Sequence, residues 1–152
     1  MFEYIAFLLF IVIVWALASL SQPKQQYGQT SITQNNETVK SKGEKYIADY
    51  FNSQDIHYQY EKEARRQGIV FSNHISNPDF YLPDHNVYVE YWGLVDADNQ
   101  KVKANYIRTM KWKMRQYYEA GIKFISIYPK NLNNLDWIFR KKFEDVTGYR
   151  LP

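Results

Sequence analysis

The sequence predicts an α/β domain with a mixed sheet flanked by helices, preceded by one transmembrane helix. Three observations predict this class: an unbroken apolar run near the start, a polar stretch after it, and a remainder that alternates between strand-like and helix-like patterns. None of the 152 residues is a cysteine, so disulfides and thiolate metal sites are excluded. The net charge of +3 is weak support for a nucleic-acid partner.

Residues 4–20 (YIAFLLFIVIVWALASL) form the apolar run and carry no charge. As a helix the run would be about 25 Å long, the lower end of a membrane span. A cleaved signal peptide and a buried core helix are the alternatives. Glu3 stands where a signal peptide carries a basic residue, and the lysines follow the run instead. The positive-inside rule therefore favours an uncleaved, single-pass anchor with the C-terminal domain in the cytoplasm.

Residues 21–41 are rich in Gln, Asn, Ser and Thr and nearly lack aliphatic side chains. Such a segment cannot bury enough apolar surface to offset its conformational entropy, so we expect a flexible tether. Residues 42–152 have a globular composition and a length that fits one compact domain.

The elements of this domain follow from their periodicity. A helix is predicted over 42–56, with Ser41 as its N-cap and Glu44 three residues later. Residues 65–77 are expected to form a loop or a short hairpin arm. Further strands and helices are predicted in the order strand 57–63, strand 79–82, strand 87–93, helix 103–120 ended by Gly121, strand 122–129 and helix 134–148. A meander that feeds a strand–helix–strand unit implies a mixed sheet.

Two carboxylates stand in strand-like surroundings: Asp79 directly follows a proline, and Glu90 comes eleven residues later. With a turn at 84–86, residues that pair across the hairpin have numbers that add up to about 169 or 170. Asp79 and Glu90 then lie opposite each other with side chains within about 5 Å. A register slip of one residue would move one acid to the other face. Two adjacent acids repel unless a proton or a hard cation such as Mg²⁺ relieves them.

Pro78-Asp79, ten intervening residues and Glu90, after a helix that carries Glu44, resemble the PD-(D/E)XK nuclease superfamily, and the order of elements is similar to that family's αβββαβ core. The resemblance covers 42–148 and implies a restriction-endonuclease-like fold. It implies that Asp79 and Glu90 bind Mg²⁺ or Mn²⁺ and that Glu44 completes the metal environment; the Tyr91 carbonyl is a further candidate ligand. The implied activity is phosphodiester hydrolysis of nucleic acid by an endonuclease, with DNA favoured, and the anchor predicted at 4–20 would attach this enzyme to a membrane. A weaker resemblance is to nuclease-like domains appended to superfamily-one helicases.

The family's lysine, two residues after the Glu, is Trp92 here, and an indole carries neither a proton nor a charge. Some members of the family place this lysine on the following helix. One face of the helix predicted at 103–120 carries Tyr106, Met110, Lys113 and Tyr117. Lys113 is therefore the expected substitute, with Lys111 and Arg108 behind it. The alternative is a catalytically inactive nuclease-like domain that binds nucleic acid or protein at the membrane.

Each candidate also has a purely structural interpretation. Asp79 could be a turn residue, Glu90 half of a structural ion pair with Lys113 or Arg108, Glu44 an acid that complements a helix dipole, and Lys113 an exposed lysine. A second rival is a tethered interaction domain that binds protein through its aromatic face and takes no metal. Trp92 and Trp112 could stack on bases, although core packing is favoured for both.

Overall fold

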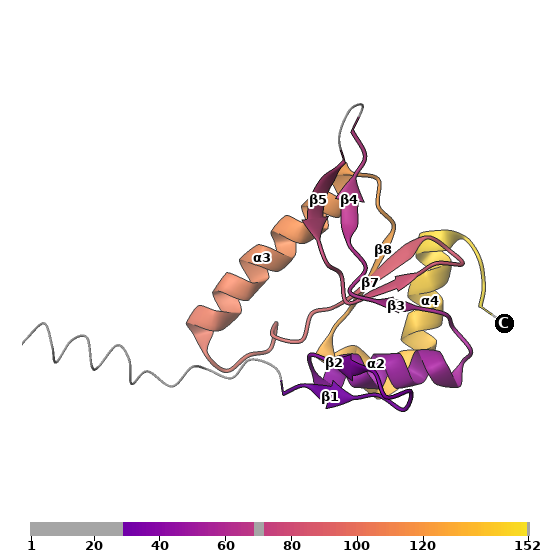
Figure 1. Cartoon of the computed structure of the whole chain (residues 1–152). Coiled ribbons are helices and arrows are strands. Elements are labelled where there is room, and N and C mark those ends of the chain that lie inside the picture. The colour runs from indigo at the N-terminus through magenta and orange to yellow at the C-terminus, as the bar shows by residue number, and fades with distance from the viewer. Residues whose placement is uncertain (1–28, 69–71, 152) are drawn as a thin grey trace, which may run out of the picture.

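The computed structural model describes residues 29–68 and 72–151 of the chain (Figure 1). The predicted transmembrane helix at 4–20 and the first part of the predicted tether lie outside these residues. Within the described ranges, no helix combines the length and the apolar character that a membrane crossing requires.

A four-stranded sheet forms the centre of the domain. Its strands are, in spatial order, β3 (Gln59–Tyr60), β6 (Phe80–Leu82), β7 (Val87–Tyr91) and β8 (Phe124–Ile127). β3, β6 and β7 pair antiparallel, whereas β7 and β8 are parallel. The predicted α/β class with a mixed sheet is thus confirmed.

Two helices cover one face of this sheet: α2 (Lys42–Ser53) and α4 (Leu135–Thr147), the latter preceded by the 3₁₀ turn η1 (Pro129–Asn134). The core between sheet and helices is apolar and fully buried, and it consists of Ile47, Ala48, Phe51, Phe80, Leu82, Val87, Val89, Ile125, Ile127, Leu135, Phe139 and Phe143. Because side chains alternate along a strand, Val87 and Val89 enter this core while Glu90 points to the opposite face.

The opposite face carries α3 (Gln100–Glu119) and a hairpin of β4 (Ala64–Arg66) and β5 (Asn73–Ser76) that packs against it. Figure 1 shows α3 as a long helix that projects to one side of the body. The Asn99 side chain caps its start by accepting a hydrogen bond from Val102 N–H. Gly121 adopts a left-handed φ of 67° after its end, as predicted.

The strand predicted at 57–63 is shorter than expected. Only β3 forms, because Glu61 takes a positive φ of 52° and turns the chain out of the sheet. The segment over 65–77 is the β4–β5 hairpin, one of the two forms expected for it. The helix expected over 103–120 begins three residues earlier, where Asn99 supplies the cap.

The second half of the expected tether at 21–41 is ordered. β1 (Ser31–Ile32) pairs with β2 (Thr38–Val39), and Val39 is fully buried. The Gln34 N–H donates to Asp49 Oδ1 of α2 over 2.8 Å, which attaches the hairpin to that helix. Contacts with α2 thus supply the burial that the composition of this segment does not predict.

Candidate active site

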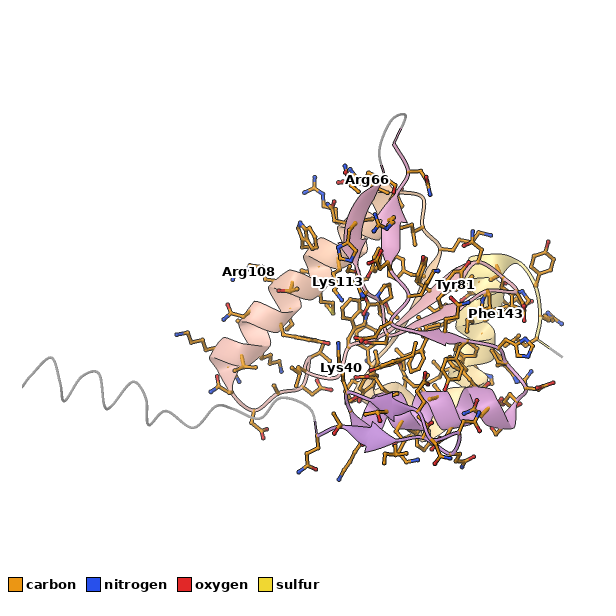
Figure 2. The ribbon with its side chains drawn as sticks, in the orientation of Figure 1. Lys40, Arg66, Tyr81, Arg108, Lys113 and Phe143 are labelled. Atoms are coloured by element: carbon orange, nitrogen blue, oxygen red, sulfur yellow. The ribbon has the colours of Figure 1, made fainter. Side chains whose placement is uncertain are left out.

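A cavity of about 460 Å³ lies between the start of α2, the end of β7 and the sheet-facing side of α3. Figure 2 shows Lys113 between α3 and the sheet, and Lys40 near the start of α2. The lining contains every residue predicted for the site, together with side chains that were not predicted. The whole set is Lys40, Ser41, Gly43, Glu44, Asp79, Glu90, Tyr91, Trp92, Gly93, Leu94, Tyr106, Thr109, Met110 and Lys113.

The β6–β7 register places the two strand carboxylates opposite each other. Phe80 pairs with Val89 and Leu82 with Val87, so partners add up to 169, one of the two registers predicted. Asp79, just before β6, thereby comes opposite Glu90. No slip separates the acids onto different faces.

Asp79 is partly accessible from the cavity and otherwise surrounded by protein. Its Oδ2 accepts a hydrogen bond from the Tyr91 N–H over 2.6 Å. Burial raises the pKa of Asp79 well above its usual range, and the negative charges of Glu90 and Glu44 raise it further. The Tyr91 N–H and the Lys113 cation oppose this rise. A proton or a bound cation would therefore offset the unfavourable negative charge of Asp79 at this position.

Glu90 is only 2% exposed, and two donors meet one of its oxygens. Oε1 accepts from Lys113 Nζ over 3.0 Å and from the Tyr117 hydroxyl over 2.5 Å. The Tyr117 hydroxyl is also in hydrogen-bond contact with Ser76 Oγ of β5. Burial raises the pKa of Glu90, and the Lys113 cation opposes this rise. Glu90 is held in one orientation by groups from α3.

Lys113 does face the sheet. Its Nζ lies 5.7 Å from the centroid of the Trp92 ring, so the ammonium sits over the residue that replaces the family's lysine. Trp92 is 2% exposed, which agrees with the predicted core position. Trp112, for which core packing was also favoured, is 52% exposed, and that prediction is wrong. Trp92 thus lines the cavity, whereas Trp112 is exposed on the surface of α3.

Glu44 lines the cavity, but both of its oxygens are engaged in local hydrogen bonds. Oε1 accepts from the Ser41 hydroxyl over 2.7 Å. Oε2 accepts from the Lys40 N–H over 3.0 Å and from the Tyr60 hydroxyl over 2.5 Å. Glu44 therefore stabilises the entry into α2, and it acts on Asp79 and Glu90 through its charge.

Tyr91 forms one wall of the cavity. Its ring is packed so closely against two glycines that a Cβ on Gly43 would lie 2.2 Å from the ring, and one on Gly93 would lie 2.7 Å away. Its carbonyl is 3.4 Å from the Tyr106 hydroxyl. A side chain larger than hydrogen at either glycine would force the Tyr91 ring, and with it this wall of the cavity, to move.

The donor set has the chemistry that a hard divalent cation requires. Within the described residues, Asp79 Oδ1 and Glu90 Oε2 accept no hydrogen bond, and the Tyr91 carbonyl adds a third oxygen nearby. Mg²⁺ accepts one or two carboxylates and keeps several waters, so a set of two acids and a carbonyl fits it. In the same part of the chain, no group of three or more His, Cys, Asp or Glu side chains is arranged to hold a metal.

The predicted site did not include the hydrogen-bonded pair beside Glu90, Tyr117 and Ser76, or two residues that line the cavity, Tyr106 and Lys40. Tyr117 and Tyr106 share the helix face of Lys113, and this spacing was the one signal in the sequence for them. Ser76 is positioned by the β4–β5 hairpin, and Lys40 by the unexpected β1–β2 hairpin.

Comparison with known proteins adds no assignment: no family model matches the chain, and neither the curated proteins nor the solved structures contain a significant match to it.

Proposed function

We propose that the protein is a membrane-anchored, divalent-metal-dependent nuclease that hydrolyses phosphodiester bonds of nucleic acid, with DNA as the favoured substrate. The observation that carries the proposal is the convergence of Asp79, Glu90 and Lys113 on one cavity. Two carboxylates for a cation and one ammonium for the developing charge are what metal-assisted phosphodiester hydrolysis uses.

The order of elements supports a restriction-endonuclease-like core. Without the β4–β5 hairpin, α2, β3, β6, β7, α3 and β8 follow the αβββαβ order, and the sheet is mixed in the same sense. In this proposal the hairpin is an insertion between the first and second strands of the core. Its Ser76 then supports the Tyr117 hydroxyl on Glu90.

Each residue has a proposed role. Asp79 and Glu90, with the Tyr91 carbonyl, would hold Mg²⁺ or Mn²⁺, and such an ion supplies Lewis acidity and a water of lowered pKa. Lys113 would stabilise charge on the phosphoryl group or orient the attacking water. Glu44 would contribute its negative charge to the cation's affinity without being a direct ligand, because its oxygens are already hydrogen-bonded.

The anchor proposed for residues 4–20 would hold this domain at the cytoplasmic surface of a membrane. Because the β1–β2 hairpin is part of the folded domain, the connection between anchor and domain would be shorter than the 21-residue tether expected at 21–41. The active cavity would then stay close to the bilayer.

The test is cleavage of supercoiled DNA, linear DNA and RNA by the full-length chain in detergent, with Mg²⁺, with Mn²⁺ and with EDTA. We expect cleavage that needs the metal and that falls by about 100-fold or more in Asp79→Ala and Lys113→Ala, the loss typical for one electrostatic group. Lys141→Ala, an exposed lysine of α4 on the other side of the sheet, is the matched control and should cleave normally. Cleavage that survives Asp79→Ala would overturn the site assignment.

A nuclease-like domain without turnover, binding nucleic acid or protein at the membrane, is the second candidate. The specific observation in its favour is the Lys113–Glu90 ion pair, which neutralises one of the two acids, together with Trp92 at the usual lysine position. This candidate predicts thermal stabilisation by Mn²⁺ that vanishes in Glu90→Ala, with no cleavage of any substrate. Failure of Mn²⁺ to stabilise the protein would instead favour a metal-free interaction domain.

A further inference from the structure

Helix α3 is bound to the rest of the domain along only a narrow part of its surface. Of its 20 residues, Tyr117 is the only buried one. The helix packs mainly on β5, and Figure 1 shows its first half projecting away from the body. Most of a long helix is therefore available to a partner.

The charge of α3 is one-sided. The helix contains six Lys and Arg residues and a single acid, Glu119, although the whole chain has a net charge of only +3. Glu119 is shared by two arginines, Arg115 of α3 and Arg66 of β4, at 2.7 and 3.0 Å. One acid cannot neutralise two guanidinium groups, so a surplus of positive charge remains. A polyanion is the partner that this charge complements.

An exposed indole, that of Trp112, lies among these basic residues of α3. Trp112 is 52% exposed and immediately precedes Lys113, which points into the site. At about 100° per residue, Trp112 lies on the helix between Thr109, which lines the cavity, and Arg108 and Arg115 on the outer surface. Figure 2 shows Arg108 on the side of α3 away from the sheet. Two arginines and an indole thus lie on the outer surface of α3, on the side of the helix that adjoins the cavity-lining Thr109.

We infer that this face of α3, made of Arg108, Trp112 and Arg115, binds a single-stranded segment of nucleic acid and leads it to the cavity. The indole would stack on an unpaired base, and the two guanidinium groups would bind the phosphates on either side. In a duplex the bases stack on one another and offer no free face to an indole. This inference rests on the proposed function and specifies its substrate as single strands or single-stranded regions.

The experiment measures binding of fluorescein-labelled oligo-dT, a matched duplex and a duplex with a single-stranded tail to the full-length chain in detergent with EDTA. We expect the single strand and the tailed duplex to bind more tightly than the blunt duplex. Trp112→Ala should weaken single-strand binding about tenfold, equivalent to about 1.4 kcal/mol, without changing its salt dependence. Arg108→Ala should reduce the slope of log affinity against log salt by about 0.7.

The controls are matched in residue type and exposure. Trp137 of α4 is 59% exposed and has Lys141 Nζ 5.4 Å from its ring centroid, so Trp137→Ala removes an exposed indole beside a cation elsewhere on the surface. Arg150→Ala removes an exposed arginine far from α3 in the chain. Neither should change strand affinity or the salt slope. Equal losses in Trp112→Ala and Trp137→Ala would overturn the inference.

Because the binding assay contains EDTA and involves no cleavage, this inference and the proposed nuclease activity can fail separately. Strand binding that Trp112→Ala weakens, with no cleavage under any condition, would keep this inference and overturn the nuclease. Metal-dependent cleavage together with an unchanged strand affinity in Trp112→Ala would support the nuclease and overturn this inference. Protection of Trp112 from hydroxyl-radical labelling by phosphatidylserine vesicles, with no oligonucleotide binding, would overturn the inference in favour of an anionic membrane surface.

Discussion

Lys113 of α3 and Glu90 of β7 form an ion pair with Nζ 3.0 Å from Oε1, and the same Nζ lies over the ring of Trp92, 5.7 Å from its centroid. The Glu90 side chain is 3% exposed and that of Lys113 is 23% exposed, so the pair lies at the boundary between protein and cavity. The lysine thus neutralises a buried acid and also lines the cavity, where the proposed nuclease would bind a phosphate. The contribution of Lys113 to stability can therefore be tested separately from its proposed contribution to catalysis.

The structural role predicts a loss of stability in Lys113→Met. Methionine keeps the apolar stem, one atom shorter, but leaves Glu90 buried without its cation, which we expect to cost about 2 kcal/mol of unfolding free energy at pH 8 because Lys113 is partly exposed. Urea unfolding followed by circular dichroism measures it. Adding Glu90→Gln to Lys113→Met should recover most of the loss, because no charge is then left unpaired. If Lys113→Met alone were as stable as the wild type, solvent would already screen the Lys113–Glu90 pair.

The raised pKa of Asp79 predicts an unusual pH dependence. When a carboxyl has a higher pKa in the folded than in the unfolded protein, the folded state binds more protons between the two values. Stability therefore falls as the pH rises from the ordinary carboxyl range through the raised folded pKa, where Asp79 becomes charged. Asp79→Asn removes this term. In EDTA the variant should be more stable than the wild type at pH 8, and the difference should vanish toward pH 4, near the ordinary value of 3.8.

A divalent metal should offset the loss of stability that the ionisation of Asp79 causes. In the proposed metal site Mn²⁺ would bind the ionised form of Asp79, so it should stabilise the wild type at pH 8 and have little effect at pH 4. Thermal unfolding with Mn²⁺ and with EDTA, in wild type and Asp79→Asn, measures both effects in one series. A wild type that gains stability steadily up to pH 8 in EDTA, relative to Asp79→Asn, would contradict the raised pKa.

The contact between Gly43 and the Tyr91 ring predicts coupling between α2 and the cavity wall. A Cβ at position 43 would lie 2.2 Å from the ring, which must therefore move in Gly43→Ala. We expect this variant to lose about 1 kcal/mol despite alanine's better helix propensity. In a Tyr91→Ala background the same substitution should be neutral or slightly stabilising. Additive effects in this double-mutant cycle would show that the ring does not contact the glycine.

The parts of the site that could be predicted from the sequence depend on short-range geometry. A turn at 84–86 determines the register of β6 and β7, and helical spacing determines that Lys113 shares a face with Tyr106 and Tyr117. Each feature is decided within a short stretch of chain, residues 79–90 and residues 106–117, where turn length and periodicity constrain the result.

The parts that could not be predicted depend on contacts between distant segments. The β1 and β2 strands have two residues each, too few for any periodicity, and only packing on α2 reveals them. Glu44 has the position expected of a metal ligand, yet its Oε1 accepts from the Ser41 hydroxyl and its Oε2 from the Tyr60 hydroxyl and the Lys40 N–H. Tryptophan is a large apolar residue for which burial is expected, but α3 packs through so narrow a face that the Trp112 indole is left exposed.

Removal of the Tyr117 hydroxyl tests what its hydrogen bond does for Glu90 while the Lys113–Glu90 ion pair stays in place. Tyr117→Phe keeps the buried ring but removes the donor 2.5 Å from Oε1, so Glu90 loses one of its two hydrogen bonds. The loss of a hydrogen bond to a buried charged group should cost about 2 kcal/mol of unfolding free energy. It should also raise the pKa of Glu90 further, because this hydrogen bond favours the ionised form.

In the proposed nuclease, Glu90 must be ionised to hold the cation, so Tyr117→Phe should shift the acidic limb of the cleavage–pH profile to higher pH. Ser76→Ala is the matched control: it removes the neighbour of the hydroxyl but leaves the Tyr117 donor to Glu90 in place. That variant should lose only about 1 kcal/mol and leave the pH profile unchanged. A purely structural hydroxyl would give the stability loss without the shift, and cleavage rates measured across pH distinguish the two.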